Sequence, residues 1–256
     1  MGMTKEELAL AFQFEGLTRS TAYDPEWVIE NTMGPNVMWL TESLSQVMKL
    51  EPGIRVLDMG CGKAVSSIFL AKEFGLQVWA ADLWIDPSDN LERIRSFGLD
   101  DQVFPVRAEA HDIPFARDFF DAIVSMDAYH YFGADDLFLR DRFSRLVRPG
   151  GQIGIVVPGL TQEFPSASPP KHLQPFWDSG FWSFHSPDWW RRNWDRSGVE
   201  VELADMIPNG WKLWMTSSDI ADRWQNKDGD EAEMMRVDRG RYLGFTRMVA
   251  RRIPNA

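Results

Sequence analysis

The pattern of apolar and polar residues changes at residue 54. Before it, residues 4–50 contain helical segments, mainly 5–14 and about 36–50, and little strand-like sequence. After it, short apolar runs alternate with amphipathic stretches of helical length, which is typical of βαβ units around a parallel sheet. Because the helical segments precede the first strand, they are candidates for a lid over the sheet.

Seven stretches have the composition of β-strands. Five of them alternate with helices between residues 54 and 158, and two more follow after a long irregular and helical region. The sequence therefore predicts an α/β fold of the doubly wound, Rossmann-like type, with a mostly parallel seven-stranded sheet. The predicted strands are 54–57, 77–81, 103–106, 122–125, 152–157, 199–203 and 242–250, and the helices among the first five are 64–74, 86–98 and 135–147.

Composition and charge restrict the possible partners. The 256 residues include 27 Lys and Arg against 38 Asp and Glu, a net charge of −11. This sign is opposite to that of proteins that neutralise phosphates, so nucleic acid and anionic membrane surfaces are not expected partners. No apolar run approaches the roughly 20 residues that a membrane-spanning helix needs. The N-terminus lacks a hydrophobic signal core, so we expect a cytoplasmic protein.

Cysteine and histidine are too sparse to predict a metal centre. The single cysteine, Cys61, excludes an intramolecular disulfide framework and a thiolate cluster, and a small buried filler is its simplest interpretation. His111, His172 and His185 show no close ligand spacing. We therefore predict no metal site.

The first βα turn carries the clearest chemical signal. Residues 56–64 read Val-Leu-Asp-Met-Gly-Cys-Gly-Lys-Ala, and a dinucleotide fingerprint would require a further glycine where the chain has Val65. Asp58 precedes the glycines, and a carboxylate beside a helix N-terminus suits a ligand with an ammonium group better than one with pyrophosphate. Asp82 follows Gly62 by 20 residues, a spacing at which a carboxylate accepts hydrogen bonds from ribose hydroxyls.

Five elements, in order and at consistent spacing, give residues 50–158 a family resemblance. They are the turn 56–62, Asp82, Glu-Ala-His-Asp-Ile-Pro-Phe at 109–115, Phe-Asp-Ala-Ile-Val-Ser at 120–125, and Leu-Val-Arg-Pro-Gly-Gly at 146–151. Together they resemble the class I S-adenosylmethionine-dependent methyltransferases. The sequence departs from the family pattern at Ala64, which replaces a third glycine, and at Glu109, which replaces the commoner Asp.

The resemblance implies S-adenosylmethionine as cofactor and assigns its contacts. The glycine turn with Asp58 would approach the methionine part, and Asp82 would bind the ribose. Leu83 would pack on the adenine ring, to which Glu109 and the backbone N–H of Ala110 would hydrogen-bond. The full predicted cofactor set is Asp58, Gly60, Cys61, Gly62, Asp82, Leu83, Glu109, Ala110 and Met126.

Neither an internal repeat nor a linker divides the chain. We therefore expect residues 1–256 to form a single methyltransferase domain. Within it, 1–50 would be the helical lid, 51–158 the cofactor-binding core, and 159–256 a substrate cap with the final strands.

The segment after the fourth strand holds the candidate catalytic residues. It lacks the Pro-Pro-aromatic element of enzymes of this fold that methylate adenine or glutamine amides, which disfavours nucleic-acid and protein amide substrates. His130 is a candidate general base, because a near-neutral imidazole suits proton removal and would lower activity below about pH 6; the alternative is a structural histidine. Asp127 would bind the methionine ammonium group or cap the next turn. Tyr129 is a third catalytic candidate, although one of Tyr129 and Tyr131 is expected in the core.

The region after the fifth strand is rich in tryptophan. Eight of the 12 Trp residues lie between Trp177 and Trp224. We interpret this region as an aromatic-rich cap that either packs on the sheet or lines a pocket for an apolar or cationic acceptor. The candidate substrate residues are Tyr131, Trp177, Trp182, His185 and Trp189.

The leading functional prediction is methyl transfer from S-adenosylmethionine to an N- or O-nucleophile of a small-molecule acceptor, releasing S-adenosylhomocysteine. Two alternatives stay open. One is a cyclase or lyase that consumes S-adenosylmethionine and gives methylthioadenosine, and the other is a non-catalytic cofactor-binding subunit. The acceptor and the oligomeric state are left open by the sequence.

Overall fold

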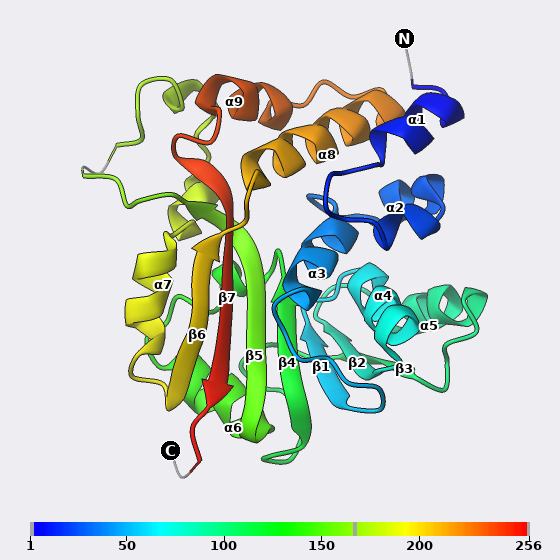
Figure 1. The fold of residues 1–256 in the computed structure, drawn as a ribbon, viewed down its shortest axis with the longest axis vertical. Helices are drawn as coiled ribbons and strands as arrows, with labels where there is room; N and C mark the ends of the chain where they lie inside the picture. The colour runs from blue at the N-terminus through cyan, green and yellow to red at the C-terminus, as the bar shows by residue number, and fades with distance from the viewer. Residues whose placement is uncertain (1–2, 166–167, 255–256) are drawn as a thin grey trace.

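A single seven-stranded sheet runs through the molecule in the strand order β3-β2-β1-β4-β5-β7-β6 (Figure 1). This computed structural model describes residues 3–165 and 168–254. Strand β7 is antiparallel to β5 and β6, while the other neighbouring pairs are parallel. The predicted mostly parallel, Rossmann-like sheet is confirmed. The strands are β1 Arg55–Met59, β2 Gln77–Asp82, β3 Val103–Arg107, β4 Phe120–Met126, β5 Val147–Leu160, β6 Val199–Met206 and β7 Leu243–Arg252.

Helices pack on both faces of the sheet. Helices α3, α4 and α5 share one hydrophobic core with one face, and α7 packs with the π-helical turn Leu139–Phe143 against the other. The N-terminal helices lie together with α8 at the end of the molecule above α4 (Figure 1). The helices are α1 Lys5–Ala11, α2 Pro25–Asn31, α3 Val37–Ser45, α4 Val65–Phe74, α5 Pro87–Ser96, α6 Ser144–Leu146, α7 Pro187–Trp194, α8 Gly210–Gln225 and α9 Glu231–Asp238.

Local capping signals fix where several helices begin. The side chain of Asp86 accepts a hydrogen bond from the backbone N–H of Ser88 at the start of α5. Ser186 caps α7 in the same way through the backbone N–H of Trp189. Each cap is followed by proline at the first helical position, where the missing N–H costs no hydrogen bond. The predicted start of the helix at 86–98 is therefore confirmed.

The helix expected at 135–147 differs most from the prediction. A π-helical turn covers Leu139–Phe143 and only Ser144–Leu146 is α-helical. Phe138 and Phe143 are five residues apart, and the wider turn places their rings 5.0 Å from each other, with both rings against Tyr129. Aromatic packing has therefore overridden the regular helical pattern.

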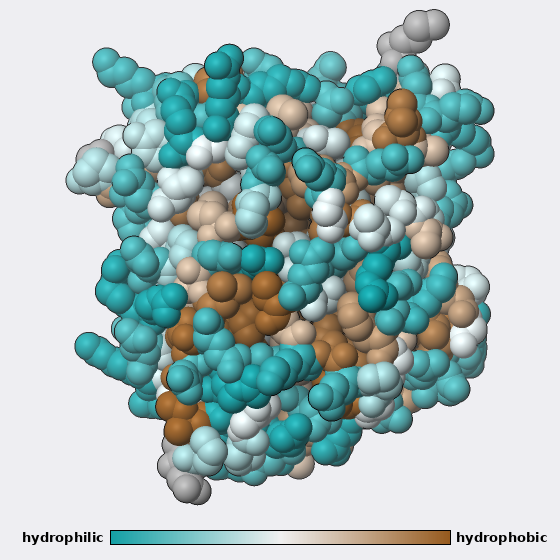
Figure 2. Space-filling model, viewed as in Figure 1, coloured by the Kyte–Doolittle hydropathy of each residue, from teal (hydrophilic) through white to brown (hydrophobic). Residues whose placement is uncertain are grey.

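The face shown in Figure 2 is mostly polar, with apolar residues gathered near its middle, over β5, β6 and β7. Within the described ranges, no helix is long and apolar enough to cross a membrane.

Candidate functional site

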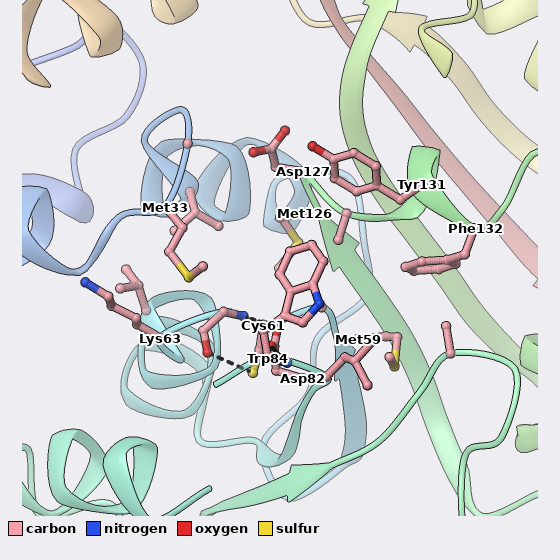
Figure 3. A pocket seen from close by; sticks show the side chains of 18 of the residues that line it. Met33, Met59, Cys61, Lys63, Asp82, Trp84, Met126, Asp127, Tyr131 and Phe132 are labelled. Atoms are coloured by element: carbon pink, nitrogen blue, oxygen red, sulfur yellow. Dashed lines mark hydrogen bonds between the residues drawn. The ribbon is translucent and has the colours of Figure 1, made fainter. Parts of the chain in front are cut away.

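A cavity of about 340 Å³ lies at the carboxyl ends of β1, β2 and β4 (Figure 3). Its walls come from the β1–α4 and β2–α5 turns, the turn after β3, and the segment that follows β4. The α2–α3 loop, with Met33 and Gly34, closes one side. The carboxyl ends of the strands are where doubly wound sheets bind their ligands.

Glycine allows the β1–α4 turn to approach the cavity closely. Gly60 has φ 75°, and a Cβ built on it would lie 2.4 Å from the Cβ of Ala128. Any other residue there would collide with the segment after β4. Ala64, where the family pattern has a third glycine, also adopts a left-handed conformation, with φ 61°. This conformation costs an L-residue roughly 1–2 kcal/mol.

Asp82 holds the turns around the cavity in place. Its carboxylate accepts hydrogen bonds from the backbone N–H groups of Gly62 at 2.9 Å, Trp84 at 2.8 Å and Ile85 at 3.0 Å. The side chain lines the cavity although the residue is only 7 % exposed. A carboxylate oxygen has more than one lone pair, so these bonds leave acceptor capacity for a ligand hydroxyl.

Asp58 does not line the cavity. Its carboxylate is fully buried and accepts hydrogen bonds from the hydroxyls of Ser66 at 2.5 Å and Ser67 at 2.6 Å, at the start of α4. Burial raises the pKa of Asp58 to about 6. The structure therefore does not support the expected contact between Asp58 and an ammonium group. Side chains alternate along a strand, and Asp58 shares the face of Val56, which packs towards α4.

The turn after β3 contributes Glu109, Ala110 and His111 to the cavity. The Glu109 carboxylate accepts the backbone N–H of His111 at 2.9 Å and lies 2.8 Å from its ring Nδ1. These contacts hold the pKa of Glu109 below its ordinary value. His111 belongs to the cavity wall, a position that the sequence analysis did not assign to it.

Asp127 and Tyr131 stand at the other end of the cavity, after β4. Asp127 has φ 54°, and no described residue donates a hydrogen bond to its carboxylate. Burial is the main cause that raises the pKa of Asp127 to about 8. Figure 3 shows the Tyr131 hydroxyl directed towards the Asp127 carboxylate. Asp127 was predicted as a catalytic candidate and Tyr131 as a substrate residue, and both line the cavity.

His130 lies behind this wall rather than in it. It is only 3 % exposed, its ring packs against Phe184 and Tyr131, and burial lowers its pKa to about 4. Burial and a low pKa do not favour a near-neutral general base at His130, and the residue does not line the cavity, so its catalytic role stays a prediction. Tyr129 is fully buried between Phe138 and Trp194, which fits the alternative expectation that one of Tyr129 and Tyr131 belongs to the core.

The aromatic-rich region after β5 packs largely on itself. Trp177 contacts Trp182 and Phe164, while the His185 ring stacks on Trp189 at 3.7 Å. None of the four predicted substrate residues in this region lines the cavity, so their contact with an acceptor stays a prediction. They are Trp177, Trp182, His185 and Trp189. A high tryptophan content indicates that the side chains of this region are buried. Which residues they pack against depends on where the connecting loop crosses the sheet.

Several cavity residues were missed by the sequence analysis. Met33 and Gly34 lie in the turn between two predicted helical stretches, and Trp84 follows Asp82 by two residues. Trp84 is 72 % exposed, which is unusual for an indole. Its position next to a predicted ribose-binding acid is a signal that could have identified it.

The predicted cofactor residues other than Asp58 surround the cavity. They are Gly60, Cys61, Gly62, Asp82, Leu83, Glu109, Ala110 and Met126. Across residues 3–165 and 168–254, the structure brings together no group of three His, Cys, Asp or Glu side chains able to hold a metal ion.

Comparisons with known proteins agree with this geometry. Residues 56–151 match the model of the methyltransferase domain family. Methyltransferase GfsG of Streptomyces halstedii is 32 % identical over 117 residues, which cover 45 % of this chain and 42 % of that protein. The chain spans about half the length of the curated relatives it matches.

Solved structures share the fold at low sequence identity. A geranyl diphosphate methyltransferase in complex with S-adenosylmethionine aligns with a TM-score of 0.68 and 18 % identity, covering 99 % of this chain and 97 % of that one. The [4+2]-cyclase SpnF aligns with a TM-score of 0.65 and 18 % identity, covering 84 % and 80 %. The matched segment contains β1, β2 and β4 and the turns that build the cavity, so the cavity lies in the part of the chain that is similar to the methyltransferase domain family.

Proposed function

We propose that the protein transfers the methyl group of S-adenosylmethionine to a nitrogen or oxygen nucleophile of a small-molecule acceptor. The observation that carries the proposal is one cavity with two chemically different ends. One end holds Asp82 and the glycine turn, and the other holds Asp127 and Tyr131. A cofactor and an acceptor need such adjacent and distinct subsites.

The residues at the first end fit an adenosyl group. Asp82 is a hydrogen-bond acceptor for ribose hydroxyls, and Leu83 and Trp84 offer apolar surface beside it. Ala110 and Glu109 also line the cavity and would bind the adenine edge. Gly60 lies too close to Ala128 to carry a side chain, so at this position the turn offers only backbone to the sulfur-bearing chain.

When bound, S-adenosylmethionine supplies an electrophilic methyl group: an acceptor lone pair bonds to the methyl carbon, and the carbon–sulfur bond breaks with its electron pair on sulfur, leaving S-adenosylhomocysteine. The protein's part is to align the acceptor and to exclude water. Met33, Met59, Met126 and Phe132 give the cavity apolar walls suited to both tasks.

Incubation of the purified protein with S-adenosylmethionine and matched sets of amines, alcohols and carboxylic acids tests the proposal. We expect S-adenosylhomocysteine and a methylated acceptor in one of the sets. Methylthioadenosine formed without an acceptor would instead identify a cyclase or lyase. Tight binding of S-adenosylhomocysteine with no product from any set would indicate a cofactor-binding subunit.

The other sequence-based assignments remain predictions. A net charge of −11 argues against nucleic-acid substrates, and a shift assay at physiological salt would test this. The cytoplasmic location likewise awaits a fractionation experiment.

A further inference from the structure

Asp127 is the one carboxylate lining the described cavity that has no hydrogen-bond partner. The other two are occupied, because Asp82 accepts three backbone N–H groups and Glu109 is bound by His111. A Cβ built on Gly34 would lie 2.5 Å from Oδ2 of Asp127. Because residue 34 is glycine, the α2–α3 loop can pass close to this carboxylate without a steric clash.

The backbone at Asp127 is left-handed, with φ 54°, and its N–H donates to the carbonyl of Val156 on β5 at 2.8 Å. Asp adopts this conformation more readily than most residues. Here it places a carboxylate in the cavity wall.

A second carboxylate makes this end of the cavity more negative. Glu231, at the start of α9, is fixed by hydrogen bonds from Nε1 of Trp214 at 2.8 Å and from the hydroxyl of Ser218 at 2.9 Å. Its charge helps to raise the pKa values of both Asp127 and Tyr131. Glu231 does not line the cavity, but its negative charge adds to the cost of ionising Asp127, and a ligand that brings a positive charge removes that cost.

No described side chain supplies that positive charge. Lys63 is the only Lys or Arg that lines the described cavity, and its ammonium group donates to the backbone carbonyl of Glu30 at 2.8 Å. In Figure 3, Lys63 lies on the opposite side from Asp127 and Tyr131. A positive charge at this end of the cavity would therefore have to come from a ligand.

Building on the proposed methyl transfer, we propose that Asp127 selects an acceptor with a protonated amine on an apolar body. The amine lies against the Asp127 carboxylate, within the field of Glu231. The aromatic and thioether side chains of Tyr131, Phe132 and Met33 contact the apolar body, and the Tyr131 ring adds a cation–π attraction.

Asp127 also provides the proton acceptor that such a substrate requires. An alkylammonium ion has no free lone pair, so one proton must move from its nitrogen to a carboxylate oxygen of Asp127 before the nitrogen can attack a methyl carbon. Burial raises the pKa of Asp127, so this proton transfer is less unfavourable than a transfer to an ordinary carboxyl group. The resulting methylated ammonium ion leaves as a cation, and the Asp127 proton passes to solvent.

Calorimetry on the protein saturated with S-adenosylhomocysteine tests the proposal with three probes of one shape. They are 2-phenylethylamine, 2-phenylethanol and 3-phenylpropanoate. We expect the amine to bind at least about tenfold more tightly than either of the others, as for a charge-assisted hydrogen bond. Asp127→Asn should abolish this preference, and Asn tolerates the left-handed backbone. Asp86→Asn, which keeps the cap of α5 and lies outside the cavity, should retain the preference.

Three results would overturn the proposal. They are no detectable amine binding at millimolar concentration, an equal or better affinity for the alcohol or the carboxylate, and a preference that survives Asp127→Asn. Weaker binding of S-adenosylhomocysteine but not of methylthioadenosine to Asp127→Asn would also overturn it, because Asp127 would then pair with the cofactor's own ammonium group. Failure of the unmodified protein to bind S-adenosylhomocysteine would refute the proposed function instead.

Discussion

The backbone N–H of Gly62 donates a hydrogen bond to the carboxylate of Asp82 at 2.9 Å, joining two turns that lie 20 residues apart in the chain. This bond ties the β1–α4 turn to the end of β2. The Asp82 carboxylate therefore shapes the cavity and remains available to a ligand. Its removal should affect both the conformation of the turns and the affinity for a ligand.

Replacing Asp82 by Ala should weaken S-adenosylhomocysteine binding at least about tenfold, because charge-assisted hydrogen bonds contribute about 1.5–3 kcal/mol. Calorimetry measures the affinity directly. Asp86→Asn is the matched control, since it removes a nearby negative charge outside the cavity and should bind normally. Unchanged affinity in Asp82→Ala would exclude this residue from the cofactor site.

Asp58→Asn should leave S-adenosylhomocysteine affinity within about threefold of the unmodified protein, because Asp58 faces Ser66 and Ser67 instead of the cavity. A tenfold loss would restore Asp58 as an ammonium partner.

The same variant should change how stability depends on pH. The pKa of Asp58 is raised to about 6 in the folded state, so its stabilising protonation is present below about pH 4 and is lost as the pH rises through 6. Relative to the unmodified protein, Asp58→Asn should therefore gain stability between pH 4 and 7, by at most about 3 kcal/mol. Denaturant unfolding at several pH values measures this slope, and a flat difference would contradict the buried ionisable Asp58.

His130→Phe should show the opposite dependence. The pKa of His130 is lowered to about 4 in the folded state, so the unfolded chain binds the extra proton between about pH 6.5 and 4, and the unmodified protein loses stability as the pH falls through that range. Phe keeps the ring contacts with Phe184 and does not titrate. Relative to the unmodified protein, the variant should thus gain stability as the pH falls, which denaturant unfolding at several pH values measures. A loss of turnover by about 10²-fold or more with intact cofactor affinity would instead support His130 as a general base.

Trp84→Ala should weaken S-adenosylhomocysteine binding by about two- to tenfold, the range expected for one aromatic contact. Trp84 lines the cavity and is 72 % exposed. Trp182 is also exposed, at 46 %, but lies in the region after β5 and outside the cavity. Trp182→Ala should therefore bind normally, and equal losses in the two variants would place the aromatic region over the cofactor.

Much of the fold could be predicted because its signals are local. Apolar runs mark the seven strands, and cap-proline pairs such as Asp86-Pro87 mark helix starts within a few residues. The cofactor end of the cavity is local too. Gly60 and Gly62 lie in one turn, and Asp82 ends the neighbouring strand of a parallel sheet, where strand ends meet at one edge.

The acceptor end could be predicted only in part. Asp127, His130 and Tyr131 all follow β4 within a few residues, and the sequence does not show which of them faces the cavity. The left-handed backbone at Asp127 and the packing of Phe184 on His130 decide this. Both depend on contacts with segments remote in the chain.

The sequence by itself determined which candidate functional segments occur and their order along the chain. They are a glycine turn, an acid 20 residues later, and a polar segment after β4. Only the tertiary structure decided that Asp58 faces α4, that Gly34 and Met33 close the cavity, and that the tryptophans after β5 pack away from it. The physical reason is that composition and periodicity report whether a side chain is buried. The partner of each buried side chain is set by how distant segments pack together.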